Sequence, residues 1–195
     1  VKQITYTPEA EGDVVFSPDG KTLAYASERE GIWNIYTAEL SHKEDINFPN
    51  ATVVIEKPLF NNNKTDRRAP VYSPDGKELA YIENRDRLMI LNLETGKTRQ
   101  ITDGSQCYST TGSFSYSWSP DGKWIVMSYC ARGHYPYDDI GIVSTKGGEP
   151  MINLTESGYT DSVPQWVLGG NAILFASERY GMRNHASWGT MEDVI

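Results

Sequence analysis

Cysteine and histidine are scarce in this sequence, which limits the chemistry that it can carry. The 195 residues include two cysteines, Cys107 and Cys130, and three histidines, His42, His134 and His185. The histidines are too scattered to predict a metal site from their spacing, and no His-Glu-x-x-His or EF-hand pattern is present. There is also no Gly-x-Ser-x-Gly elbow and no glycine loop of the kind that holds phosphate. The sequence therefore predicts no catalytic centre, no metal site and no cofactor.

Long apolar runs and an excess of positive charge are also missing. No apolar run approaches the roughly 18–20 residues that cross a membrane, and the first residues lack the pattern of a signal peptide. The 26 acidic and 18 basic residues give a formal net charge of −8, which argues against nucleic acid as a partner. With 38% hydrophobic and 23% charged residues, the composition is typical of a globular domain that buries a core.

What the sequence does contain is a turn motif that occurs three times. Ser-Pro-Asp-Gly-Lys occupies residues 17–21, 73–77 and 119–123, and a degenerate copy, Val-Leu-Gly-Gly-Asn, occupies residues 167–171. Proline presets the second position of a type I turn, aspartate tolerates the third, and glycine takes the left-handed position that follows. Such a turn joins two antiparallel strands with a bulge. Four glycines are therefore predicted to be structural rather than ligand-binding: Gly20, Gly76, Gly122 and Gly170.

Apolar residues flank each turn with the alternation that is typical of paired, half-buried strands. An aromatic residue precedes each turn, an aliphatic residue lies three positions after each glycine, and a second large apolar residue follows two positions later. The four copies are separated by 56, 46 and 48 residues, which is close to the length of a propeller blade. The sequence thus predicts an all-β fold, a β-propeller of four-stranded antiparallel blades.

The repeats divide residues 1–195 into a single propeller segment with about four blades' worth of sequence. Residues 1–12 are predicted to end a preceding blade, with 1–5 as its outermost strand, because Val1–Thr5 resembles Thr98–Thr102 at the end of a later repeat. A chain that begins inside a blade is expected to have been cut from something longer. The blades that follow are predicted at 13–68, 69–113 and 114–162, with a partial blade at 163–195 whose third strand begins near Met191.

Two loops on the face opposite the turns are chemically rich. Loops on a rigid scaffold commonly carry binding sites, and propeller sites tend to surround the central channel. The candidate peptide- or partner-binding residues are His134, Tyr135, Tyr137, Asp138, Asp139, Arg183, His185 and Trp188. These side chains could instead pack the loops between neighbouring blades, and the sequence leaves both alternatives open. The repeated links Ser27–Gly31 and Ser177–Gly181, by contrast, are predicted to be structural.

The repeat resembles that of the propellers of TolB and of tricorn-type peptidases. Residues 16–29, Phe-Ser-Pro-Asp-Gly-Lys-Thr-Leu-Ala-Tyr-Ala-Ser-Glu-Arg, match that repeat nearly residue for residue. Residues 180–194 are similar to the amino-terminal propeller of bacterial tricorn-like serine peptidases. The resemblance implies a six-bladed parent propeller, followed by a second propeller, a PDZ-like module and the peptidase domain. None of the peptidase motif lies in this chain, so the resemblance implies no catalytic residue here.

The resemblance implies a non-catalytic segment that binds peptides or a protein and guides or gates peptides toward a protease domain outside this chain. Its partners would be peptides, the remaining blades and that protease domain, and its location would be the periplasm or cell envelope. Two alternatives stay open. One is a TolB-like protein-interaction scaffold in the periplasm, and the other is the propeller of a prolyl-oligopeptidase or dipeptidyl-peptidase relative.

Two further expectations follow from the resemblance. If the parent is exported, Cys107 and Cys130 either form a disulfide or remain two unrelated thiols, and the sequence does not decide between these. Propellers of about 4–8 blades exist, so a small four-bladed ring is conceivable. We instead expect an open arc with the spacing of a six-bladed parent, because the large side chains of the second strands can fill wide gaps between blades: Tyr25, Tyr81, Met127 and Phe175.

Overall fold

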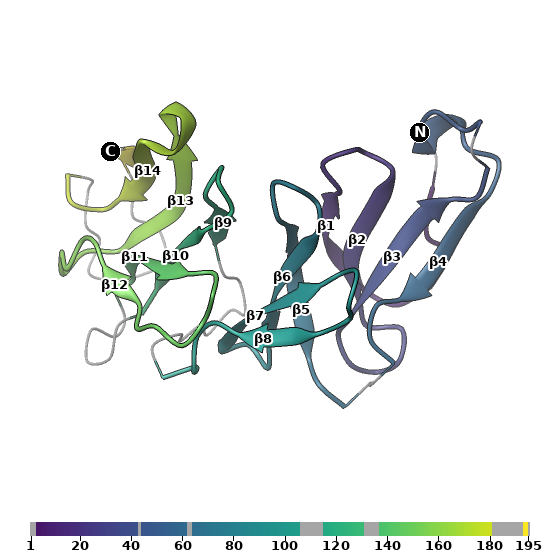
Figure 1. The fold of residues 1–195 in the computed structure, drawn as a ribbon. Helices are drawn as coiled ribbons and strands as arrows, with labels where there is room; N and C mark the ends of the chain where they lie inside the picture. The colour runs from purple at the N-terminus through teal and green to yellow at the C-terminus, as the bar shows by residue number, and fades with distance from the viewer. Residues whose placement is uncertain are drawn as a thin grey trace. The chain divides into compact units, whose positions relative to one another are not determined.

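The computed structural model describes residues 3–42, 44–61, 64–105, 115–130 and 137–180, together with the backbone of 193–194. Nearly all of the regular structure in these ranges is β-strand (Figure 1). The exceptions are two single-turn 3₁₀ helices, η1 (Phe48–Asn50) and η2 (Leu168–Gly170). Neither these nor any other helix in the described ranges has the length and apolar character needed to cross a membrane. The prediction of an all-β fold is confirmed.

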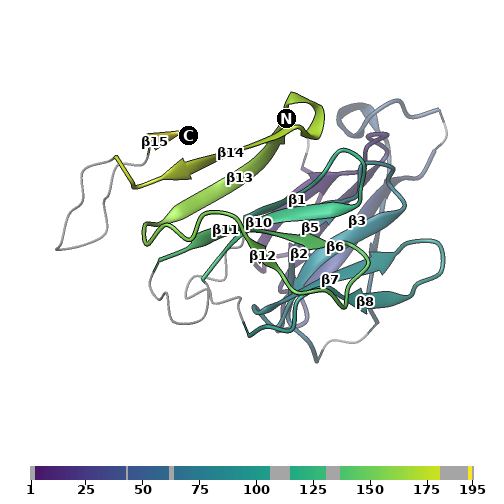
Figure 2. The ribbon, with the colours of Figure 1, turned by 60° about the vertical axis from the view of Figure 1, so that its left-hand side comes forward.

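The strands form four sheets in which neighbours along the chain are neighbours in the sheet (Figures 1 and 2). The first sheet contains β1 (Glu11–Phe16), β2 (Thr22–Ser27), β3 (Asn34–Leu40) and β4 (Val54–Pro58). The second contains β5 (Arg67–Tyr72), β6 (Glu78–Glu83), β7 (Arg87–Asn92) and β8 (Thr98–Gln100). The third contains β9 (Tyr116–Trp118), β10 (Trp124–Tyr129), β11 (Asp139–Ser144) and β12 (Ile152–Asn153), and the fourth contains β13 (Asp161–Val167), β14 (Ala172–Ser177) and β15 (Asp193–Val194). This succession of meanders is the architecture of propeller blades.

The chain divides into two compact units. The first comprises Val1–Arg85 and Met89–Thr98, and the second comprises Asp86–Leu88 and Arg99–Ile195. The first unit therefore holds the first sheet and most of the second, and the second unit holds the third and fourth sheets. The open arc depends on how the units are placed, and it stays a prediction.

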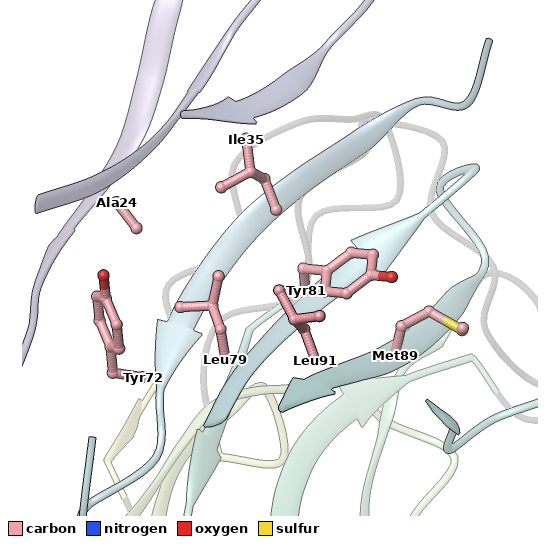
Figure 3. Close-up of a cluster of buried hydrophobic side chains, with 7 residues drawn as sticks. All are labelled: Ala24, Ile35, Tyr72, Leu79, Tyr81, Met89 and Leu91. Atoms are coloured by element: carbon pink, nitrogen blue, oxygen red, sulfur yellow. The ribbon is translucent and has the colours of Figure 1, made fainter. Parts of the chain in front are cut away.

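The main core of the first unit lies between its two sheets. Ala24 and Ile35 come from the first sheet, and they face a larger group from the second sheet in Figure 3: Tyr72, Leu79, Tyr81, Met89 and Leu91. Tyr81 and Leu79 are almost completely buried, and full burial of such a side chain stabilises the fold by about 1.5–3 kcal/mol. The second-strand aromatic of this repeat thus fills the gap between sheets, as its position in the sequence predicts.

A second core lies on the other side of the first sheet. It contains Leu23, Tyr25, Tyr36, Ala38 and Phe48. Phe48 belongs to η1, inside the polar connection between β3 and β4, and its ring packs edge-on against Phe16 with centroids 5.8 Å apart. The side chain of Asn47 caps η1 by accepting a hydrogen bond of 3.1 Å from the Asn50 amide. The connection is mostly polar in sequence, yet Phe48 anchors it to the second core.

Each Ser-Pro-Asp-Gly turn satisfies its own polar groups in the same way. The serine hydroxyl donates to the aspartate Oδ1 at 2.6, 2.7 and 2.7 Å in the first, second and third turns. The same Oδ1 accepts the lysine amide at 3.1 Å in all three turns. The glycines have φ of 71°, 72° and 71°, a region that excludes most side chains. The repeated chemistry therefore produces one repeated geometry.

A bulge precedes three of the four turns. The strand register shifts between Gly12 and Val15, between Arg68 and Val71, and between Ser162 and Gln165. One residue inside each bulge has positive φ, and the three occupy the same repeat position: Asp13, Ala69 and Val163. Positive φ is an outlier for a β-branched residue such as valine, so the bulge is imposed by the sheet and not by local sequence preference.

The two ends of the chain differ in how well the sequence predicts them. Residues 1–5 were expected to be a strand, but residues 3–5 are not in one, and for these residues the prediction is wrong. A strand requires a paired neighbour, whereas here the Gln3 side chain donates to the Thr5 carbonyl at 2.8 Å and Ile4 packs against the second core. At the other end, β15 pairs with β14, Val194 opposite Ala176 (Figure 2), which confirms a third strand in the fourth blade.

The turn geometry generates a stability prediction for Gly76→Val. We expect the free energy of unfolding to fall by about 1–3 kcal/mol, because a β-branched residue at positive φ is strained. A Cβ at Gly76 would lie 3.4 Å from Cδ of Pro18, whereas a Cβ at Gly20, with nearly the same φ, would meet no described atom within 4 Å. Gly20→Val therefore separates the backbone effect from the contact with Pro18. Urea unfolding of both variants provides the measurement, and an unchanged midpoint for Gly76→Val would contradict a structural role.

Candidate functional site

The structure describes three of the eight candidate binding residues. These are Tyr137, Asp138 and Asp139, which lead into β11. The remaining five candidates lie outside the described residues: His134, Tyr135, Arg183, His185 and Trp188. Cys107 also lies outside them. Ligand contact by this set and the Cys107–Cys130 disulfide both stay predictions.

Asp139 belongs to the framework of the second unit. It is only 1% exposed. Its Oδ2 accepts a hydrogen bond of 2.8 Å from the side-chain amide of Asn153. Its Oδ1 accepts bonds of 3.2 Å from the backbone amide of Ser157 and 3.3 Å from the Thr155 hydroxyl. A buried carboxylate is costly unless it is hydrogen-bonded in this manner. Asp139 thus ties the connection after β12 to the start of β11.

Asp161 is a buried acid near this site that sequence reasoning missed. Its side chain is fully buried, its amide donates to the Asp138 carbonyl at 2.8 Å, and its Oδ2 accepts from the Ser157 hydroxyl at 2.7 Å. Its Oδ1 has no hydrogen-bond partner within the described ranges. Asp161 stands six positions before its turn copy, as Glu11 does in the first repeat, and that alignment is the signal that could have found it.

Asp138 has an unusual acidity for an aspartate. Burial, together with the charge of Asp139, raises the pKa of Asp138 to about 6. Cys130 lies in the same environment, where burial and the charges of both aspartates raise the pKa of its thiol. Tyr137, immediately before Asp138, is 42% exposed. The described part of the site therefore offers an accessible aromatic ring next to an acid that titrates near pH 6, a combination suited to contact with a polar ligand.

Metal binding finds no support in the described ranges. No three His, Cys, Asp or Glu side chains come together there in an arrangement that could hold a metal ion. Of the two adjacent acids, Asp138 is partly buried and Asp139 accepts hydrogen bonds from Asn153, Thr155 and Ser157.

The shifted pKa of Asp138 predicts a pH-dependent stability difference. In the unfolded chain Asp138 ionises near pH 4 and in the folded chain near pH 6, so the folded state binds more protons between these values. Its contribution therefore falls as pH rises from about 4 to 6. We expect Asp138→Asn to match the parent at pH 4 and to exceed its stability at pH 7 by about 1 kcal/mol, a figure reduced for the partial exposure of the group.

Urea unfolding of both proteins from pH 4 to pH 7 provides the measurement. Carboxylates whose pKa is lowered, such as Glu11, titrate identically in parent and variant, so the difference isolates Asp138. A difference that stays constant with pH would contradict the raised pKa.

The link after β2 is held by Arg29. Its Nη2 lies 2.8 Å from Glu11 Oε1 and its Nη1 lies 3.1 Å from Glu56 Oε2. Its Nε donates to the Ser27 hydroxyl at 3.1 Å, and the guanidinium lies over the Tyr36 ring, 4.1 Å from the centroid. The prediction that the Ser27–Gly31 link is structural is confirmed.

The equivalent arginine of the fourth sheet is held less firmly. Arg179 is exposed and lies 5.7 Å from the Tyr159 ring centroid. Among the described residues it makes no ion pair, whereas Arg29 makes two. The residue equivalent to Glu11 is Asp161, which is one methylene shorter and hydrogen-bonds to Ser157 instead.

This contrast predicts different costs for removing the two arginines. Arg29→Met should lower the free energy of unfolding by about 2–3 kcal/mol, because it leaves Glu11 and Glu56 partly buried without their cation. Arg179→Met should cost less than about 1 kcal/mol, since only an exposed cation–π contact is lost. Chemical unfolding of both variants decides this, and equal costs would refute the assigned role of Arg29.

No family model matches the chain, but two curated bacterial proteins are similar to part of it. Dipeptidyl-peptidase 5 of Porphyromonas gingivalis is 31% identical over 131 residues, which are 60% of this chain and 17% of the peptidase. The uncharacterized peptidase YuxL of Bacillus subtilis is 30% identical over 114 residues, which are 54% of this chain and 16% of that protein. The chain thus spans less than a fifth of the length of either relative.

Solved structures extend the likeness over almost the whole chain. TolB from Acinetobacter baumannii matches with a TM-score of 0.68 and 17% identity, covering 98% of this chain and 42% of TolB. The tricorn protease matches with a TM-score of 0.61 and 14% identity, covering 91% of this chain and 16% of the protease. At these identities the likeness concerns the fold, and the chain folds as β-propeller blades of the type present in TolB and the tricorn protease.

Proposed function

We propose that this chain is a non-catalytic, peptide- or protein-binding propeller segment of a larger bacterial serine peptidase. It guides or gates peptides toward a protease domain outside this chain. The observation that carries the proposal is the similarity to dipeptidyl-peptidase 5 over 131 residues. The matched region is only 17% of the length of that peptidase. The same proposal includes a location in the periplasm or cell envelope, which the resemblance to tricorn-like peptidases implies.

The type of parent peptidase has two candidates. The resemblance of residues 180–194 and the tricorn fold likeness favour a tricorn-like parent, with its nucleophile in a distant carboxy-terminal domain. The similarity to dipeptidyl-peptidase 5, beside that to the uncharacterized peptidase YuxL, favours a dipeptidyl-peptidase relative. A Gly-x-Ser-x-Gly elbow in the parent sequence would indicate the dipeptidyl-peptidase type. A TolB-like scaffold, which processes no peptide, is the third candidate and is supported by the repeat resemblance and by the fold likeness to TolB.

The two described residues directly before β11, Tyr137 and Asp138, offer contacts for a peptide. Tyr137 presents an accessible ring, and Asp138 beside it changes charge near pH 6. Aromatic side chains supply large contact area at interfaces. These features fit a surface that contacts extended peptides and do not require chemistry from the chain itself.

Peptide binding by the intact 195-residue chain tests the proposal. A set of fluorescein-labelled decapeptides of different charge would be titrated with the chain and followed by anisotropy. We expect saturable binding, with the same peptides recovered uncut by mass spectrometry. Tyr137→Ala should weaken binding at least fivefold, because an interface aromatic is removed. Tyr6→Ala, which removes another exposed tyrosine, serves as the control and should leave binding unchanged.

Two results would overturn the proposal. Cleavage of the peptides by the chain alone would contradict a non-catalytic segment. If none of the peptides bound saturably, the result would contradict a peptide-binding role and would favour the TolB-like scaffold.

A further inference from the structure

A polar pocket of about 470 Å³ opens in the first unit, between its two sheets and at the end that carries the turns. One wall is formed by Thr37 and Glu39 of β3 and by Lys57 of β4. The opposite wall is formed by Tyr72 at the end of β5 and by Asp75 of the turn that follows. We call this cavity the turn pocket. Its volume is in the range of sites that hold small ligands or single long side chains.

Negative charge exceeds positive charge in the turn pocket. Asp19, Glu39 and Asp75 supply three carboxylates, whereas Lys57 supplies the single ammonium group in the lining. Lys57 is already paired, with its Nζ 2.7 Å from Glu39 Oε1. Hydrogen bonds within the turns lower the pKa of Asp19 and Asp75, so both are ionised at neutral pH. A cation is therefore the ligand that the pocket favours electrostatically.

Two hydroxyl groups add hydrogen-bonding capacity to the charge. Thr37 is 4% exposed, and its Oγ1 has no hydrogen-bond partner in the part of the chain that the structure describes. A buried hydroxyl in this condition is unfavourable and rare in folded proteins. Burial and the charges of Glu39 and Asp19 raise the pKa of Tyr72 to about 12, so its phenol is neutral at neutral pH.

The fold itself does not require this polar wall. The equivalent pocket of the second unit, of about 350 Å³, lies beside the Ser119-Pro120-Asp121 turn, which has the same hydrogen bonds as the first turn. The strand residues that line it, however, are apolar: Trp124, Ile142 and Trp166. By the strand registers and the turn positions they correspond to Thr22, Thr37 and Tyr72 of the turn pocket. Ser144 and Ile152, which correspond to Glu39 and Lys57, are not among the lining residues of this pocket.

The lining also distinguishes an organic cation from a metal ion. No metal-binding group of three acidic, histidine or cysteine side chains occurs in the described ranges. Pro18, Leu59 and Leu93 contribute apolar surface to the pocket. A cationic head on an alkyl stem matches both parts of this lining, because such side chains bury their methylene groups while the charge stays among polar groups.

We propose that the turn pocket binds the side chain of an arginine or lysine in a peptide. Glu39 and the turn aspartates face its charge, and Pro18, Leu59 and Leu93 contact its stem. The Oδ1 atoms of Asp19 and Asp75 hold the turns, and their carboxylates add negative charge to the pocket. The proposal deepens the peptide-binding function above and rests on it. The pocket chemistry would also accept a free organic cation, so the proposed function supplies the reason to name a peptide as the source of the cation.

Calorimetric titration of the intact chain tests the proposal with three probes. Acetyl-Ala-Arg-Ala-amide carries the cation, its citrulline analogue is a neutral isostere, and agmatine is a free guanidinium compound. We expect the arginine peptide to bind at least tenfold more tightly than the citrulline peptide. Glu39→Gln should weaken its binding about tenfold, because a charged contact is lost. Thr37→Val, which keeps the shape of the side chain, should weaken it about threefold.

A matched control removes the same charge elsewhere in the unit. Glu9→Gln alters an exposed acid outside the pocket and should leave affinity unchanged. Equal binding of the arginine and citrulline peptides, or equal effects of Glu39→Gln and Glu9→Gln, would overturn the pocket proposal while leaving peptide binding intact. Binding of agmatine without either peptide would support a cation pocket and contradict its peptide source. Binding of none of the three probes would overturn the pocket, and the decapeptide titration would then decide the peptide-binding function separately.

Discussion

The hydrogen bond from serine hydroxyl to aspartate carboxylate in each turn is the interaction on which the blades depend. It closes the hairpin between the first two strands of three sheets, and it sets their register: Phe16 opposite Leu23, Tyr72 opposite Leu79 and Trp118 opposite Ile125. A slip of one residue would move every apolar side chain of a strand to the wrong face. A short polar motif therefore controls which side chains enter the core, although it contributes little apolar surface itself.

The space between sheets is where the repeats differ from one another. In the first unit Tyr72, Leu79 and Tyr81 fill most of it, and the remainder is the turn pocket with its polar wall. In the second unit Trp124, Ile142 and Trp166 line the equivalent space. The first and third sheets share the same Ser-Pro-Asp-Gly turn and the same strand order, so the exchange of polar for apolar side chains at matched positions leaves this framework unchanged. Function on repeat folds is carried by such local sites and not by the architecture.

Sequence reasoning was most successful for the strands and least successful for the acids. The period-two pattern beside each turn predicted paired strands there, and β2, β10 and β14 lie directly after the turns. Asp138 and Asp139, in contrast, are adjacent and look alike in the sequence. The structure separates them, because Asp139 accepts three hydrogen bonds while burial raises the pKa of Asp138 to about 6. Their environments come from residues 14 to 23 positions away, such as Asn153 and Asp161, and no local pattern contains that information.

The blade repeat, the positions of the turns and the strands beside them can be read from the sequence alone, but not that β2, β3, β6 and β7 are buried on both faces. The properties that can be read are local, since they follow from the conformations that proline, aspartate and glycine allow and from the two-residue period of a strand. The folded structure was needed to see that Phe48 anchors a polar connection, that Arg29 joins Glu11 to Glu56, and that Thr37 and Glu39 share a pocket with Tyr72. Each of these contacts joins residues that are distant in the chain, and their energies depend on burial and charge that arise when the sheets pack together.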